Sequence, residues 1–118
     1  MFRFEKLDVW HKAIEFADLV YSLTNKFPSE ERFGLTTQMR RAAVSVPSNI
    51  AEGSSRIFDR DFAHFIEIGY GSVMEVVSQA FISRRQGFLS QESFQQLYAA
   101  AEEIARMMSG LRGALLKE

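Results

Sequence analysis

Residues 37–53 read TQMRRAAVSVPSNIAEG, and this stretch decides how the chain folds. Its apolar residues recur at steps of three and four, which is the spacing of one buried face of an α-helix. Proline within a helix removes a backbone donor and crowds an earlier carbonyl, so we predict that this helix is kinked near Pro47. Gly53-Ser54-Ser55 is predicted to end it. With one residue from before the stretch, the predicted buried face consists of Leu35, Met39, Ala42, Ala43, Val46 and Ile50.

The same periodicity predicts three further helices, one before this stretch and two after it. Phe27-Pro28 ends the first of the four, because proline disfavours helix in the residue before it. Gly87 and Phe88 follow the third in the pattern of a Schellman ending. In chain order, the residues predicted to cap the helices are Asp8, Ser29, Asp59 and Ser90. The predicted core positions are Val9, Ala13, Phe16, Ala17, Val20, Tyr21 and Thr24 in the first helix, Phe62, Phe65, Ile66, Gly69, Val73, Val76, Val77, Ala80 and Phe81 in the third, and Phe94, Leu97, Ala101, Ile104, Met108, Leu111 and Leu115 in the fourth.

Length and composition indicate one all-α domain over residues 1–118. The chain has 118 residues and only 2 prolines, and no strand or hairpin pattern competes with the helices. A helix of about 25 residues spans roughly 38 Å. Helices of this length joined by short connections predict an antiparallel up-down-up-down four-helix bundle.

Charge and residue content exclude several classes of protein. Lys and Arg number 14 against 15 Asp and Glu, so the chain lacks the basic excess of a dedicated nucleic-acid domain. The absence of cysteine excludes disulfides, thiolate zinc sites and cysteine nucleophiles. The first residues do not follow the pattern of a signal peptide, and no apolar run approaches the ~18 residues of a membrane span. We therefore expect a cytoplasmic protein with no membrane partner.

Patterns typical of metal sites and of catalysis are not met. A ferritin-like di-metal site needs Glu-x-x-His on two helices, but neither His11 nor His64 follows a glutamate at that spacing. Arg60 precedes His64 by a shorter gap than in helical ribonucleases of the Arg–His type. The glycines at 69 and 71 follow no strand, so they do not form a phosphate loop. We predict a non-enzymatic protein with no metal and no cofactor.

A polar stripe runs beside the buried face of the helix that contains residues 37–53. If this helix and the next fold back around a turn centred near Arg56, Ser45 lies level with Glu67, and Arg41 lies level with the stretch that ends at Glu75. We therefore predict an Arg41–Glu75 contact. The stripe is either a satisfied polar network that fixes helix register or a site for a ligand or partner. Its residues are Gln38, Arg41, Ser45, Asn49 and Glu52, with Glu75 facing it from the next helix.

Arginines provide a candidate basic surface. The alternative to binding is ordinary solvation, with the arginines that end the third helix offsetting its dipole. An oligomer that repeats one basic surface gathers charge that a single chain lacks. Two hypotheses therefore stand: RNA or DNA binding by an oligomer, or a protein-interaction scaffold or accessory subunit with no nucleic-acid role. The candidate nucleic-acid contacts are Arg40, Arg56, Arg60, Arg84 and Arg85.

The stretch at residues 37–53 resembles the signature of the four-helix bundle proteins encoded in intervening sequences of bacterial 23S rRNA genes. The resemblance extends over residues 2–90, and the fourth helix matches in pattern only. The chain is also similar to the accessory protein of diversity-generating retroelements. Supporting matches are Phe4, Leu7, Val9-Trp10, Ala13, Phe27-Pro28, Glu31, Phe33-Gly34-Leu35, Phe62, Phe65, Gly71-Ser72 and Glu75.

The resemblance implies a bacterial protein that folds as an elongated bundle and assembles as a ring, a homopentamer. It assigns no molecular function to the family. The retroelement accessory protein implies binding to nucleic acid and to a reverse transcriptase. Aromatic residues outside the core stripes are candidates for the contacts between subunits. These are Phe2, Phe4, Phe33, Phe58 and Phe88, together with Trp10.

Overall fold

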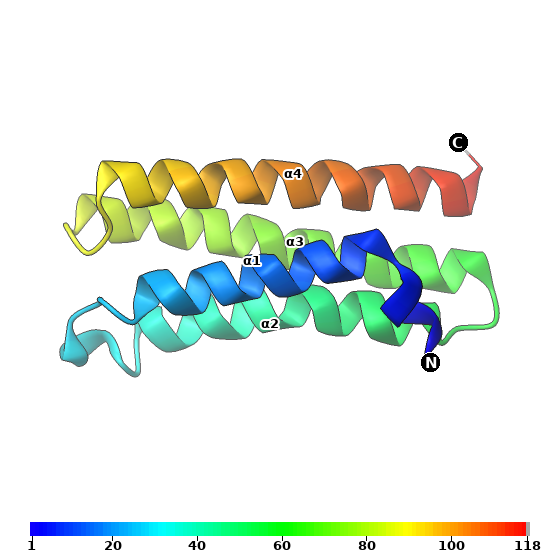
Figure 1. Ribbon diagram of the computed structural model, residues 1–118, viewed down its shortest axis with the longest axis horizontal. Helices are drawn as coiled ribbons and strands as arrows, with labels where there is room; N and C mark the ends of the chain where they lie inside the picture. The colour runs from blue at the N-terminus through cyan, green and yellow to red at the C-terminus, as the bar shows by residue number, and fades with distance from the viewer. Residues whose placement is uncertain (118) are drawn as a thin grey trace.

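Within residues 1–117, which the structure describes, the computed structural model has four α-helices and no strand (Figure 1). The helices are α1 (Asp8–Thr24), α2 (Leu35–Ser54), α3 (Asp59–Arg85) and α4 (Gln91–Leu116). Short 3-10 turns, η1 (Arg3–Lys6) and η2 (Ser29–Glu31), lie before α1 and between α1 and α2. The predicted all-α class is confirmed.

The four helices run antiparallel and form an elongated bundle that measures 44 × 24 × 20 Å (Figure 1). Each helix packs against two neighbours, in the cyclic order α1, α2, α3 and α4. The pairs α1/α3 and α2/α4 lie on the diagonals, and within the described residues their Cα atoms do not come within 8 Å of each other. The α1/α2 pair and the α3/α4 pair therefore form opposite sides of the bundle, as the up-down-up-down arrangement requires.

One continuous core fills the bundle and contains most of the predicted positions. The predicted face of α2 is buried from Met39 to Ile50, while Leu35 is half-buried. Two predicted core residues, Tyr21 and Phe81, are exposed instead. The ring of Tyr21 lies at the surface, and the Arg40 guanidinium lies over it at 4.5 Å from the ring centroid. Helical periodicity identifies the face of the helix on which such a residue lies. It does not tell how deeply a side chain at the edge of that face is buried.

The end of α3 and the start of α4 agree with the prediction from the sequence. Ser90 Oγ accepts a hydrogen bond from Ser93 N at 3.1 Å, which confirms it as the cap of α4. Gly87 has a φ of +81°, and its N–H donates to Arg84 O at 3.0 Å. Phe88 N donates to Ser83 O at 2.9 Å, which completes the predicted Schellman ending.

The predicted start of α2 at Ser29 is wrong. Ser29 begins the turn η2, and α2 begins only at Leu35, after Gly34. The reason is a different cap: Glu31 Oε1 accepts a hydrogen bond from Leu35 N at 3.1 Å. Asp8 and Asp59 are also not caps, because each is the first residue of its helix rather than the one before it. Their carboxylates still lie near the positive end of the helix dipole.

A proline and two glycines are buried inside α2 and α3. Pro47 is buried within a continuous α2, and the kink near it stays a prediction. A Cβ at Gly53 would lie 2.7 Å from Phe65 Cβ, and one at Gly69 would lie 2.8 Å from Met108 Cε and 3.6 Å from Val46 O. Gly71, by contrast, has no such neighbour within 4 Å.

Exposed ion pairs tie α4 to both of its neighbours. Lys12 Nζ on α1 lies 3.2 Å from Glu103 Oε1 on α4. Arg112 Nε, also on α4, lies 3.0 Å from Glu67 Oε2 on α3. The Glu103 carboxylate, through its hydrogen bond and its charge, raises the pKa of Lys12. Such pairs contribute little to stability because water screens them. Among the described residues, no helix is both long and apolar enough to span a membrane.

Candidate functional site

The polar stripe of α2 is divided into a half-buried part and an exposed part. Ser45 Oγ lies 2.5 Å from Ser72 Oγ on α3, and Asn49 Nδ2 donates to Ser45 Oγ at 3.1 Å and to Ser45 O at 2.8 Å. These three side chains satisfy one another between α2 and α3. The structure therefore joins Ser45 and Asn49 of the predicted network directly, and it adds Ser72, which the sequence analysis had noted only as a family match.

The register of α2 against α3 differs from the sequence-based expectation. Ser45 faces Ser72 rather than Glu67, and residues 55–58 connect the two helices. The midpoint of residues 45 and 72 is 58.5, so the centre about which the two helices are level lies beyond Arg56, where we had placed it. A later turn centre moves every α2 residue to a position further along α3.

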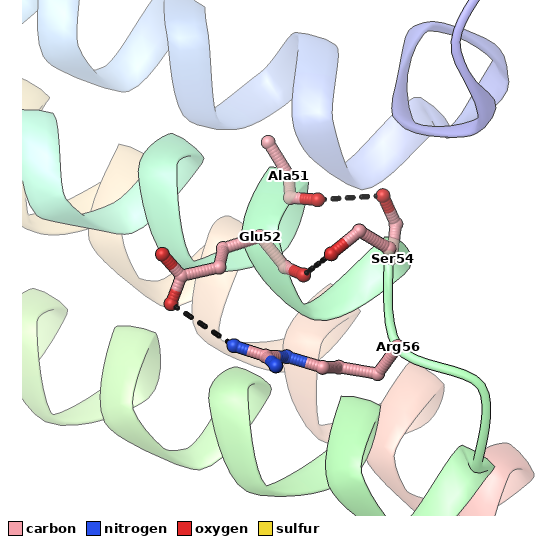
Figure 2. A network of polar contacts seen from close by, with 5 residues as sticks. Ala51, Glu52, Ser54 and Arg56 are labelled. Carbon is pink, nitrogen blue, oxygen red and sulfur yellow. Dashed lines mark hydrogen bonds and ion pairs between the residues drawn. The ribbon is translucent and has the colours of Figure 1, made fainter.

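The remaining residues of the stripe do not form one network. Arg41 and Glu75 are both exposed, and no ion pair or hydrogen bond joins them within residues 1–117, so the predicted contact is not formed. Gln38 is exposed as well. Glu52 pairs instead with Arg56, whose Nη2 lies 3.8 Å from Glu52 Oε2 (Figure 2). Because Arg41 is exposed, no buried carboxylate depends on it for its partner. Arg41 is therefore not part of a satisfied polar network that fixes helix register.

The five candidate nucleic-acid arginines do not form one surface. Arg56 and Arg60 lie at the α2–α3 connection, whereas Arg40, Arg84 and Arg85 lie toward the opposite end of a bundle 44 Å long. Three of them also have intramolecular partners. Arg40 donates to Thr24 Oγ1 and to Asn25 Oδ1, each at 2.9 Å, and so links α1 with α2.

Aromatic rings hold two of the other arginines. The Arg56 guanidinium lies 4.6 Å from the ring centroid of Phe65, and that of Arg84 lies 5.5 Å from that of Phe94. Arg60 and Arg85 are exposed, and within the described part of the chain they have no hydrogen bond, ion pair or ring contact. These two are the arginines whose charge remains available to a partner.

Two apolar grooves lie on the long sides of the bundle. The groove between α1 and α2 has a volume of 420 Å³ and is lined by Trp10, Ile14, Val44 and Pro47 among others. The groove between α3 and α4 has a volume of 400 Å³, with Tyr70, Met74, Tyr98 and Arg106 in its lining. Because the two helix pairs form opposite sides of the bundle, so do the two grooves.

The fold, the polar contacts and the grooves can now be set beside known proteins. Residues 5–110 match the sequence model of the 23S rRNA-intervening sequence protein. The chain belongs to this family. No curated protein matches the chain.

A solved structure shares the fold of this 23S rRNA-intervening sequence protein. It is a protein of unknown function from the S23 ribosomal protein family of Bacteroides thetaiotaomicron, with a TM-score of 0.79 and 20% sequence identity. The match covers 88% of this chain and 97% of that chain. The family resemblance stated from residues 37–53 is thereby confirmed. The solved structure supports the fold of this chain and indicates no activity for it.

Sequence reasoning missed the groove residues of this family member. Ile14, Val44 and Met74 lie off the predicted core stripes, and none was among the candidate site residues. The signal that could have found them is an apolar residue on the outward face of an amphipathic helix. The predicted aromatic contacts include two groove residues, Phe4 and Trp10, whose rings lie 4.9 Å apart. No cluster of three or more potential metal-ligating side chains occurs among residues 1–117.

Proposed function

We propose that this 23S rRNA-intervening sequence protein is a non-enzymatic, cytoplasmic scaffold that assembles from copies of itself. In this proposal, the α1/α2 groove of one copy binds the α3/α4 side of the next. The observation that carries the proposal is the pair of apolar grooves on opposite sides of the bundle. No cofactor takes part in it.

Exposed apolar side chains around both grooves support self-association. The side chains of Tyr21 and Val44 on one side, and of Met74 and Phe81 on the other, are between 42% and 48% exposed. Apolar surface that gathers in this way marks an interaction site more often than scattered single residues do. The groove charges also differ: Asp18 lies in the first groove, and Arg106 lies in the second beside an acidic neighbour.

Two unlike faces imply a head-to-tail contact rather than a twofold one. A head-to-tail contact leaves one groove free at each end of a row of copies, so the row either closes into a ring or continues as a filament. We propose closure into a ring, with the five copies that the family resemblance implies. The copy number rests on that resemblance alone.

The proposal predicts that one charge in either groove disrupts assembly. Val44→Glu and Met74→Glu each place a carboxylate on a surface that the neighbouring copy would desolvate, and an unpaired charge in an interface is costly. We expect light scattering to show a several-fold mass for the wild type at micromolar concentration, and 13.5 kDa for each variant. Gln95→Glu, on the exposed face of α4 outside both grooves, should keep the wild-type mass.

A mixture of the two variants tests the head-to-tail geometry itself. Val44→Glu retains an intact α3/α4 side and Met74→Glu an intact α1/α2 groove, so an equimolar mixture should form a dimer of twice 13.5 kDa and nothing larger. A monomeric wild type would contradict self-association. A wild-type oligomer that both variants leave intact would show that the grooves are not its interfaces.

Nucleic-acid binding by the ring is a second candidate function. The observation that favours it is the free charge of Arg60 and Arg85, which a ring would repeat around each of its two ends. Phosphate contacts release counterions, so affinity should fall steeply with salt. We expect fluorescence anisotropy with structured RNA and duplex DNA to show binding at low salt that Arg60→Ala/Arg85→Ala weakens. The absence of binding at low salt would leave only the scaffold.

A further inference from the structure

Four highly exposed apolar side chains gather at one end of the bundle. Ile57 is 90% exposed, Phe2 72% and Phe58 65%, and Met1 beside them is 88% exposed. Residues 57 and 58 belong to the α2–α3 connection, and the N-terminal segment lies at the same end (Figure 1). We refer to Met1, Phe2, Ile57 and Phe58 as the apolar tip.

The N-terminal half of the tip is fixed to the bundle. Arg3 Nη1 donates to Ser54 O at 3.4 Å, and the Arg3 guanidinium lies 5.1 Å from the ring centroid of the buried Phe62. Phe2 N donates to Glu5 Oε2 at 2.7 Å, and the rings of Phe2 and Phe4 stack at 5.9 Å. Phe2 is therefore held outward by the segment around it, although water surrounds its ring.

The other half of the tip is fixed in the same way. Ser54 Oγ donates to Ala51 O at 2.7 Å and Ser55 Oγ to Glu52 O at 2.6 Å, which closes the C-terminal turn of α2 (Figure 2). Arg56 follows, held by Glu52 and by the ring of Phe65. Ile57 thus leaves a well-bonded turn and faces outward. A preformed surface loses little conformational entropy when it binds.

The charges around the tip indicate what can cover it. Within the segments of residues 1–6 and 52–61, four basic side chains and the α-amino group of Met1 lie among four acidic side chains. A surface that binds an anionic membrane or nucleic acid needs an excess of basic residues, which is absent here. A rim that carries both signs around an apolar centre can be complementary to itself, because a twofold axis can bring each sign opposite the other. The eight side chains are Arg3, Lys6, Arg56 and Arg60 with Glu5, Glu52, Asp59 and Asp61.

We infer that the apolar tip binds the same tip of a second copy, end to end about a twofold axis. The contact is separate from the two grooves, because it uses the end of the bundle rather than its sides. In an assembly formed through the grooves, the copies lie side by side and their apolar tips share one face. The tip contact joins two such assemblies through that face. Each assembly therefore doubles.

The area of the tip determines how strong this contact is. The cross-section of 24 × 20 Å limits the buried area to roughly 400 Å² per chain, against about 800 Å² per partner in a standard stable interface. One tip pair is therefore weak, and several pairs between two rings are strengthened by their high effective concentration. Doubling should thus be far tighter in the ring than between single chains.

Sedimentation velocity over a series of protein concentrations tests the inference. We expect the wild type to show twice the mass of the side-by-side assembly, and Ile57→Ser/Phe58→Ser to halve that mass while leaving the side-by-side assembly intact. Phe2→Ser, in the other segment, should also halve it. Phe33→Ser is the matched control, because Phe33 is 88% exposed at the opposite end, and it should leave the mass unchanged.

The outcomes separate this inference from the proposed scaffold. If the groove variants dissociate the side-by-side assembly, tip doubling should persist only as a weak monomer–dimer equilibrium at high concentration, which Ile57→Ser/Phe58→Ser abolishes. An assembly that never doubles, or that doubles equally well in the tip variants, overturns the inference and leaves the scaffold standing. Co-sedimentation with phosphatidylserine–phosphatidylcholine vesicles should be absent, and tip-dependent binding to them would also overturn it.

Discussion

Phe62→Ala is expected to lower the free energy of unfolding by about 3–5 kcal/mol. Phe62 lies in the first turn of α3 and is 1% exposed. Its removal leaves a cavity that the surrounding helices fill only in part, which adds to the lost burial of the ring. The Arg3 guanidinium would also lose the ring over which it lies, at 5.1 Å from the centroid.

Urea denaturation followed by circular dichroism measures this loss. Phe33→Ala makes the same chemical change at a ring that is 88% exposed, and it should alter the unfolding free energy by at most ~0.5 kcal/mol. Similar losses for the two variants would mean that Phe62 is not part of the core. The N-terminal segment should in addition become more susceptible to proteolysis in Phe62→Ala than in the control.

Gly53→Ala is expected to destabilise the protein by about 1–3 kcal/mol, although alanine favours a helix by ~1 kcal/mol over glycine. The added Cβ would lie 2.7 Å from Phe65 Cβ and 2.8 Å from Phe62 Cδ1, so α2 and α3 would have to move apart. A Cβ of a neighbouring helix cannot move aside as the end of a flexible side chain can.

Gly71→Ala is the matched control for this substitution. Its Cβ would meet no atom within 4 Å beyond its own helix and chain neighbours, so alanine there should stabilise the protein by about 0.5–1 kcal/mol. The two substitutions add the same methyl group within helices that pack on each other, yet their effects on the denaturation midpoint should have opposite signs. Effects of the same sign would contradict the close approach at Gly53.

The fold was largely predictable because helix periodicity acts over short distances. The seam of α4 from Phe94 to Met108 and its cap at Ser90 each depend on residues within a few positions. The start of α2 was not predictable in the same way. It depends on the Glu31 carboxylate, which reaches Leu35 N only after the η2 turn has formed.

The candidate site was predictable only in part, because it depends on contacts between helices. The sequence places Ser45, Asn49 and Arg41 on one stripe, but the packing of α2 on α3 decides what each of them meets. Ser45 therefore has a partner at Ser72, whereas Arg41 stays exposed. The candidate nucleic-acid arginines show the same limit. Their number can be read from the sequence, but the sequence does not reveal that most of the length of the bundle separates them.

The Ser45–Ser72 hydroxyl pair has a consequence for how the chain tolerates change. One helical turn to either side of Ser72 lie Ile68 and Val76, so a slipped α2 would leave the hydroxyl of Ser45 against an apolar side chain. The slip would break the hydrogen bond between the two hydroxyls, at a cost of about 0.5–1.5 kcal/mol, which favours a single alignment of the two helices. Since this alignment is enforced at mid-helix, insertions or deletions in residues 55–58 can alter the connection without displacing the two helices from each other.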